Sequence, residues 1–139
     1  MFKKLLLPLD LTDRHEAVLD LAEGLLRQAG GEAVLLHVIE VIPGIPRDED
    51  RAFYDRLERN ARKHLEPLAR RLEARKLRGE LVIRFGQRPR ETLAYAREAA
   101  ADLILLTSPR FDPAHPAASL SSLSFKLSLA SPIPVLLVK

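Results

Sequence analysis

Five short apolar segments, separated by segments with helical patterning, are the feature that most constrains how this chain can fold. They are residues 4–9, 33–39, 81–85, 103–106 and 135–138. Each has the length of a β-strand, and the first two and the last two are almost continuously hydrophobic, as strands buried on both faces are. The order β-α-β-α-β-α-β-α-β predicts an α/β fold: a single-domain, doubly wound, mostly parallel five-stranded sheet with helices on both faces.

Four helices are expected between these strands. They should begin near residues 12, 48, 89 and 117. Thr12 or Asp13 is a suitable N-cap for the first helix, and Pro89 is a natural first residue for the third. The second should run to about residue 76, with Pro67 kinking or breaking it. The fourth should be one helix that ends near residue 129.

The composition excludes several kinds of functional site. The 139 residues suit one domain, residues 1–139. Cysteine is absent, which excludes a disulfide framework, a thiolate zinc site and a cysteine nucleophile. The apolar run near the N-terminus is too short for a signal peptide, and no run is long enough to cross a bilayer. We therefore expect a cytoplasmic protein with no membrane partner.

The net charge of +3 owes much to basic residues of the predicted second helix. Three acid–base pairs are spaced i,i+4 along it: Asp55–Arg59, Glu58–Arg62 and Glu66–Arg70. Such pairs are typical of a solvated helix face. Aromatic residues make up only 5% of the chain, so platforms for stacking single-stranded bases are scarce. Nucleic acid is not the expected partner, and a nucleic-acid-associated protein using this basic helix is kept as an alternative.

Polar residues at the carboxyl ends of the strands are the candidates for a ligand site, because ligands of such sheets bind there. Asp10 follows the first strand, where its carboxylate can accept from a ligand or only from groups of its own turn. The other candidates are His37 with Val38, Gly86, and Thr107 with Ser108. No two histidines have the spacing of a helical metal pair, so no metal is expected. Walker, G-x-G-x-x-G and G-x-S-x-G motifs are absent, so no catalytic residue is predicted.

Four stretches of the sequence resemble the universal stress proteins. KKLLLPLDLTDRHEAVLDLAEGL is similar to the family's opening, in which the first strand ends in Pro-x-Asp, and AVLLHVIEV to its second strand. FGQRPRETLAYAREAAADLILL resembles its third helix and fourth strand, and SPIPVLLVK its closing strand. The resemblance covers essentially the whole chain. It implies a Rossmann-like fold of the adenine nucleotide alpha hydrolase type, strand order 3-2-1-4-5, and a cytoplasmic homodimer formed through the C-terminal strand Val135–Val138.

The resemblance also implies a nucleotide site. Pro8, Asp10 and Val38 match family positions that line the base and the ribose, and Gly86 matches the glycine before the third helix. Two of these matches have simpler explanations as well. A buried strand needs a residue such as Val38, and a tight turn needs a glycine such as Gly86.

The phosphate-binding part of that site departs from the family pattern. ATP-binding members carry G-x-x-G after the fourth strand, followed nine residues later by G-S or G-T. Residues 107–122, which we call the phosphate loop, contain no glycine. Counted from either neighbouring strand, the motif falls on other residues, chiefly Thr107, Ser108, Arg110, Phe111, Leu120, Ser121 and Ser122. Side chains there obstruct the approach of backbone N–H groups to phosphate, so the loop is predicted to be degenerate.

Together these features predict a non-enzymatic dimer with a regulatory or stress-response role, no cofactor, and an unknown protein partner or small ligand. It is not expected to bind ATP in the usual way. The alternative is an ATP- or AMP-binding protein, with weak ATPase activity at most, in which Arg110 supplies altered phosphate contacts. The prolines of residues 108–117 suggest an ordered cap over the crevice above Asp10, with Arg110 turned toward Asp10 or Asp112.

Overall fold

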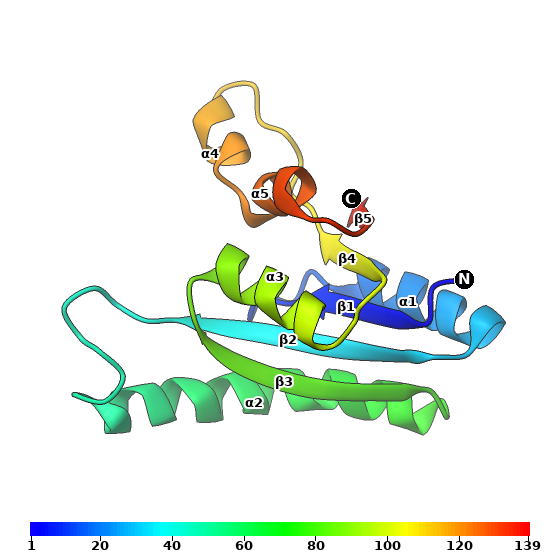
Figure 1. Cartoon of the computed structure of the whole chain (residues 1–139), viewed down its shortest axis with the longest axis horizontal. Helices are drawn as coiled ribbons and strands as arrows, with labels where there is room; N and C mark the ends of the chain where they lie inside the picture. The colour runs from blue at the N-terminus through cyan, green and yellow to red at the C-terminus, as the bar shows by residue number, and fades with distance from the viewer.

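The computed structural model describes all 139 residues and contains one five-stranded sheet with helices on both faces (Figure 1). The strands are β1 (Lys4–Pro8), β2 (Glu32–Glu40), β3 (Arg78–Gly86), β4 (Leu103–Thr107) and β5 (Val135–Val138). The helices are α1 (Glu16–Ala29), α2 (Arg51–Ala74), α3 (Arg88–Glu98), α4 (Pro116–Leu120) and α5 (Leu123–Ala130). All paired strands are parallel, in the order β3-β2-β1-β4-β5. The predicted fold class and strand order are confirmed.

Successive side chains of the central strands enter two hydrophobic cores, one on each face of the sheet. Leu5 and Leu7 of β1 pack with α1 and α2, whereas Leu6 packs on the opposite face with α3 and α5. All three side chains are fully buried. A strand covered on both faces has no polar alternation, which is why β1 reads as a continuous apolar run.

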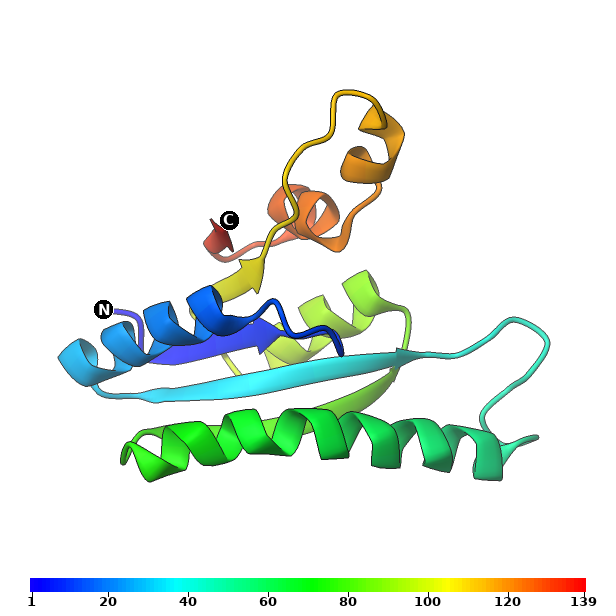
Figure 2. The same ribbon diagram turned by 180° about the vertical axis from the view of Figure 1, so that it is seen from behind.

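The helices extend unequally around the sheet. Figure 2 shows α2 running along β3 for most of the length of the molecule. The loop after β4, together with α4 and α5, projects beyond the end of the strand and away from β2 and β3 (Figures 1 and 2). None of the helices is both long enough and apolar enough to cross a membrane.

The first helix begins later than its capping residues predict. α1 starts at Glu16, and neither Thr12 nor Asp13 caps it. The Thr12 backbone N–H and hydroxyl both donate to the Asp10 carboxylate, at 3.0 and 2.5 Å. These bonds hold residues 10–12 in a turn, so the helix begins later. His15 is the N-cap residue, and its side chain does not bond a helix N–H.

The predicted break at Pro67 and the predicted single fourth helix are both wrong, each for a local reason. Pro67 does not break α2, which continues to Ala74. Pro67 is exposed, so water can reach the carbonyl that loses its backbone partner there. The fourth predicted helix is in fact two. Ser122 has an extended backbone, and its hydroxyl accepts from the Phe125 N–H, so α5 starts afresh there.

Candidate functional site

A pocket of about 510 Å³ lies at the carboxyl ends of β1, β2 and β4. This edge contains the switch point between β1 and β4, where the strand order reverses and ligands of doubly wound sheets bind. The walls come from the turn after β1, the end of β2, the N-terminal half of α2, the end of β4 and the α4–α5 junction. Sites for small molecules usually enclose roughly 300–1,000 Å³. The pocket therefore has the size and the position of a ligand site.

The structure divides the predicted site residues into two groups. Those that line the pocket are Pro8, Asp10, Val38, Thr107, Ser121 and Ser122, together with the strand-end candidate His37. Those outside its lining are Gly86, Ser108, Arg110 and Phe111. The two ends of the phosphate loop thus reach the pocket, while residues 110–120 lie outside its lining.

Gly86 has a structural reason to be glycine. It ends β3 with a φ of +144°, a region that side chains disfavour. A Cβ added to it would lie 2.8 Å from Glu91 Cγ, on the first turn of α3. The close approach of strand and helix accounts for this residue without a ligand.

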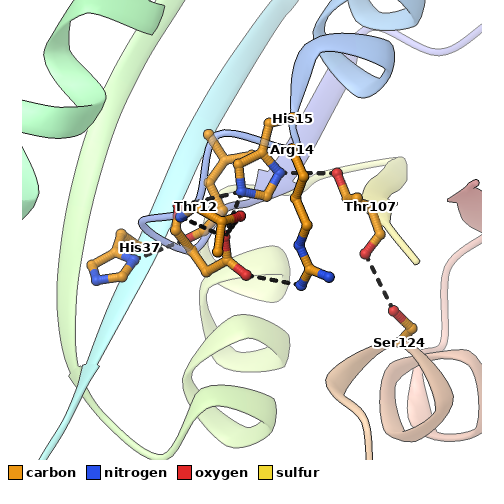
Figure 3. Close-up of polar contacts among 8 residues, drawn as sticks. Thr12, Arg14, His15, His37, Thr107 and Ser124 are labelled. Carbon is orange, nitrogen blue, oxygen red and sulfur yellow. Dashed lines mark hydrogen bonds and ion pairs between the residues drawn. The ribbon is translucent and has the colours of Figure 1, made fainter. Parts of the chain in front are cut away.

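Asp10 is held by donors from its own turn, Thr12, Arg14 and His15, which Figure 3 labels. Besides Thr12, His15 Nε2 lies 2.7 Å from Asp10 Oδ1, and Arg14 Nη2 lies 2.9 Å from Oδ2. Partial burial acts to raise the pKa of Asp10, but the hydrogen bonds from Thr12, His15 and Arg14 outweigh it and hold the pKa well below its usual range. The carboxylate is ionised at neutral pH, and it organises the β1–α1 turn.

His15 links this turn to β4. Its side chain is buried, and Nδ1 lies 2.9 Å from Thr107 Oγ1. Because an ionised Asp10 can only accept, His15 Nε2 donates to it, and Nδ1 is left to bond the Thr107 hydroxyl. The Thr107 carbonyl in turn accepts from the Ser124 hydroxyl on α5, at 3.4 Å. A line of polar contacts therefore crosses the pocket wall from the β1–α1 turn to α5 (Figure 3).

The aspartate–histidine–threonine arrangement suits binding better than acyl transfer. A hydroxyl nucleophile needs nearby donors to stabilise the oxyanion that forms when it attacks. The Ser108 N–H already donates to the Val138 carbonyl at 2.8 Å, and Pro109 has no N–H. The two backbone positions directly after Thr107 therefore offer no donor, and the contacts among Asp10, His15 and Thr107 fix the shape of the wall.

Two arginines also line the pocket, and sequence reasoning missed both. Arg14 pairs with Asp10, and Arg88 Nε lies 2.6 Å from Glu40 Oε1. Arg14 stands four residues after Asp10, and that spacing could have indicated the pair. No group of three or more histidine, aspartate or glutamate side chains is arranged to hold a metal ion. The polar lining therefore consists mainly of hydroxyls, imidazoles and paired charges.

The predicted cap over Asp10 is wrong. The crevice is open, and Arg110 is exposed with no ion pair. Each acid has a closer partner: Asp10 pairs with Arg14, and Asp112 Oδ2 lies 2.9 Å from His115 Nδ1. Both contacts span at most four residues, so they form within the turn and within the loop, and neither acid needs Arg110.

The family model for the universal stress proteins matches residues 1–139, the whole chain. This chain is a universal stress protein. No curated protein matches it at a significant level. Its membership therefore rests on the match to the family model. Similarity to solved structures supports the fold separately.

Solved structures share the universal stress protein fold. The hypothetical protein MJ0577 superposes with a TM-score of 0.81 at 24% identity, over 100% of this chain and 96% of that one. A universal stress protein from Archaeoglobus fulgidus, solved in complex with dAMP, gives 0.72 at 20% identity over 99% and 98%. Another, in complex with cAMP, gives 0.71 at 17% identity over 99% and 96%. At these identities the likeness establishes the fold.

Proposed function

We propose that this universal stress protein is a non-catalytic regulator whose pocket binds an adenine nucleoside or mononucleotide and does not grip a triphosphate in the usual way. The observation that carries the proposal is the open pocket lined by Pro8, Asp10 and Val38 beside a loop that lacks glycine. The family resemblance assigns those three positions to base and ribose. The relatives solved with dAMP and cAMP support the same class of ligand.

The phosphate end of the pocket favours a short ligand. The Ser108 N–H is already bonded, Pro109 has none, and Arg110 lies outside the lining, which argues against altered phosphate contacts by that arginine. The backbone donors left at this end are the first N–H groups of α5. Ser121 and Ser122 offer hydroxyls, and Arg14 offers a charge that Asp10 already shares. Such groups can contact one phosphate. A chain of three phosphates needs more cationic or N–H donors than this wall presents.

The regulatory role is proposed to operate in a cytoplasmic homodimer. β5 pairs with β4 on one side only, and its other edge is free to pair with a second copy. Leu136 on this strand is 40% exposed, which supports a contact there. Ligand binding would then change the surface that an unknown protein partner recognises in the stress response.

Titration calorimetry with adenosine, AMP and ATP, with and without Mg²⁺, tests the proposal. We expect AMP or adenosine to bind, and ATP to bind no more tightly than roughly 100 µM. Mass spectrometry of small molecules released from the denatured protein identifies the ligand that is carried through purification. Low-micromolar ATP binding with weaker AMP binding contradicts the phosphate argument, and no binding of any adenine compound contradicts the assignment of the pocket.

A pair of variants locates the binding. Asn60→Trp places a large side chain in the pocket from the exposed face of α2, so it should lower the affinity for AMP at least tenfold. Arg110→Ala changes an exposed residue outside the pocket and should leave that affinity within about twofold. Equal effects of the two changes would place the ligand elsewhere.

A further inference from the structure

Besides Arg51 at its first position, three basic residues of α2 have no acidic partner. Of the three pairs predicted from the sequence, Glu58–Arg62 and Glu66–Arg70 form, at 3.5 and 3.7 Å, but Asp55–Arg59 does not. Arg56 and Lys63 are unpaired as well, and all three free cations are exposed. Two of the three predicted pairs are thus confirmed, and the third is wrong.

Together with Arg70, which pairs with Glu66, these three residues form a straight row. At about 100° per residue, Arg56, Arg59, Lys63 and Arg70 fall within an arc of about 60°. The arc lies opposite the buried side of α2, which is made by Tyr54, Ala61, Leu65 and Leu72. From Arg56 to Arg70 the row is roughly 21 Å long, at about 1.5 Å per residue. We call these four residues the α2 ridge.

The sequence itself keeps the ridge positive. Arg56 has Ala52 and Asn60 at the i±4 positions, and Lys63 has Arg59 and Pro67. None of these i±4 neighbours is acidic. Glu66 stands three residues after Lys63 but pairs with Arg70, and Asp55 stands four residues before Arg59 without pairing with it. The acids of this region, Asp55, Glu58 and Glu66, fall to one side of the ridge, and the other side carries neutral residues such as Asn60 and Pro67.

We propose that the α2 ridge docks on the phosphodiester backbone of duplex nucleic acid without reading its sequence. A duplex carries one negative charge per roughly 1.7 Å of its axis, so a straight row of cations meets several phosphates without rearranging. The ridge has no aromatic side chain on which unpaired bases could stack, which favours duplex over single strand. Contacts of this kind position a protein on the duplex and carry no base specificity. The proposal goes beyond the nucleotide pocket and does not depend on it.

Fluorescence anisotropy with two unrelated labelled DNA duplexes tests the proposal. We expect both to bind equally, with log K falling against log salt at a slope of about −3, as release of counterions from three or four phosphates requires. Between about 25 and 200 mM salt the affinity should fall by several hundredfold. No binding at the lower salt overturns the proposal.

Two triple variants distinguish the effect of the α2 ridge on duplex binding from the effect of net charge. Arg56→Gln/Arg59→Gln/Lys63→Gln removes the free cations of the ridge. Arg27→Gln/Arg97→Gln/Lys126→Gln removes three exposed, unpaired cations from α1, α3 and α5. Each triple lowers the formal net charge from +3 to 0. The circular dichroism spectrum of each variant should match that of the wild type, which checks that both fold.

The ridge variant should lose at least tenfold in affinity, and its salt slope should fall to about −1, whereas the control should stay within about threefold of the wild type. Equal losses would mean that net charge alone drives binding, and the proposal fails. Poly-glutamate of matched charge serves as a competitor. If it binds as tightly as the duplex, the ridge serves an acidic protein partner and the proposal also fails.

Discussion

His15 Nδ1 lies 2.9 Å from Thr107 Oγ1, and this contact joins the turn after β1 to the end of β4 across 92 residues of sequence. β1 and β4 are neighbours at the switch point of the sheet, and the pocket opens between their carboxyl ends. With Asp10 on its other nitrogen, the buried ring has both polar atoms satisfied. His15 therefore fixes how the β1–α1 turn sits against β4.

Replacing His15 should destabilise the protein. His15→Ala leaves a cavity and removes donors and acceptors from Asp10 and Thr107, so we expect a loss of about 2–4 kcal/mol in the free energy of unfolding. Urea denaturation followed by circular dichroism measures it. His64→Ala, at an exposed position of α2, is the control and should change stability by less than about 0.5 kcal/mol. Similar losses in both variants would show that His15 has no special role.

Asp10 should contribute stability that acid removes. Its pKa is held below the usual range in the folded protein, so the contribution is complete above the unfolded pKa of about 3.9 and is lost as pH falls toward the folded value. The difference in unfolding free energy between wild type and Asp10→Asn should be constant from pH 7 to about 5 and shrink below about pH 4. Asp13→Asn, at an exposed position nearby, should show little difference at any pH. A gap that stays constant down to pH 2 contradicts the role given to this carboxylate.

Glu23 should matter more than an ordinary helix acid. Its buried carboxylate accepts from Arg71 Nε at 2.7 Å and from Arg75, and these bonds tie α1 to α2. Glu23→Gln should cost about 2–4 kcal/mol, because it leaves the partly buried Arg71 without its inner partner. Glu58→Gln breaks a solvated pair with Arg62 at 3.5 Å and should cost less than about 0.5 kcal/mol. Thermal and urea unfolding of the two variants measure the contrast.

The proposed dimer makes a prediction about β5. Val135 and Leu137 pack against the core of their own subunit, so changes there risk unfolding it. Leu136 is exposed, and Leu136→Lys should convert a dimer into a folded monomer in light scattering. Leu21→Lys, at a similarly exposed leucine on α1, should leave the mass unchanged. A monomeric wild type at high micromolar concentration would refute the assembly.

The sheet could be predicted because its signal is local. Leu5 to Leu7 place apolar side chains on both faces of β1. Because such strands alternate with amphipathic helices along the chain, only a few sheet topologies are possible. Helix starts were less predictable, since Thr12, a predicted N-cap, instead donates its N–H and its hydroxyl to Asp10. Capping propensities describe a helix end in isolation, and this turn has its own acceptor.

The candidate site was predictable in position but not in its contacts. Asp10 and Thr107 stood out because each ends a strand. The role of His15 depends on the tertiary pairing of β1 with β4, and no sequence spacing encodes that pairing. Arg110 was assigned to an acid by charge alone, whereas Arg14 reaches Asp10 from the same turn.

The pairing of Arg14 with Asp10 has a consequence for ligand choice. A ligand that offers an amine or hydroxyl to this carboxylate must replace a donor that the protein already supplies. The contact is then an exchange between equivalent bonds, and it adds little net affinity. Discrimination among bases should therefore come from the shape of the apolar wall around Val38, and changes to that wall should alter which base is accepted more than changes to the acid do.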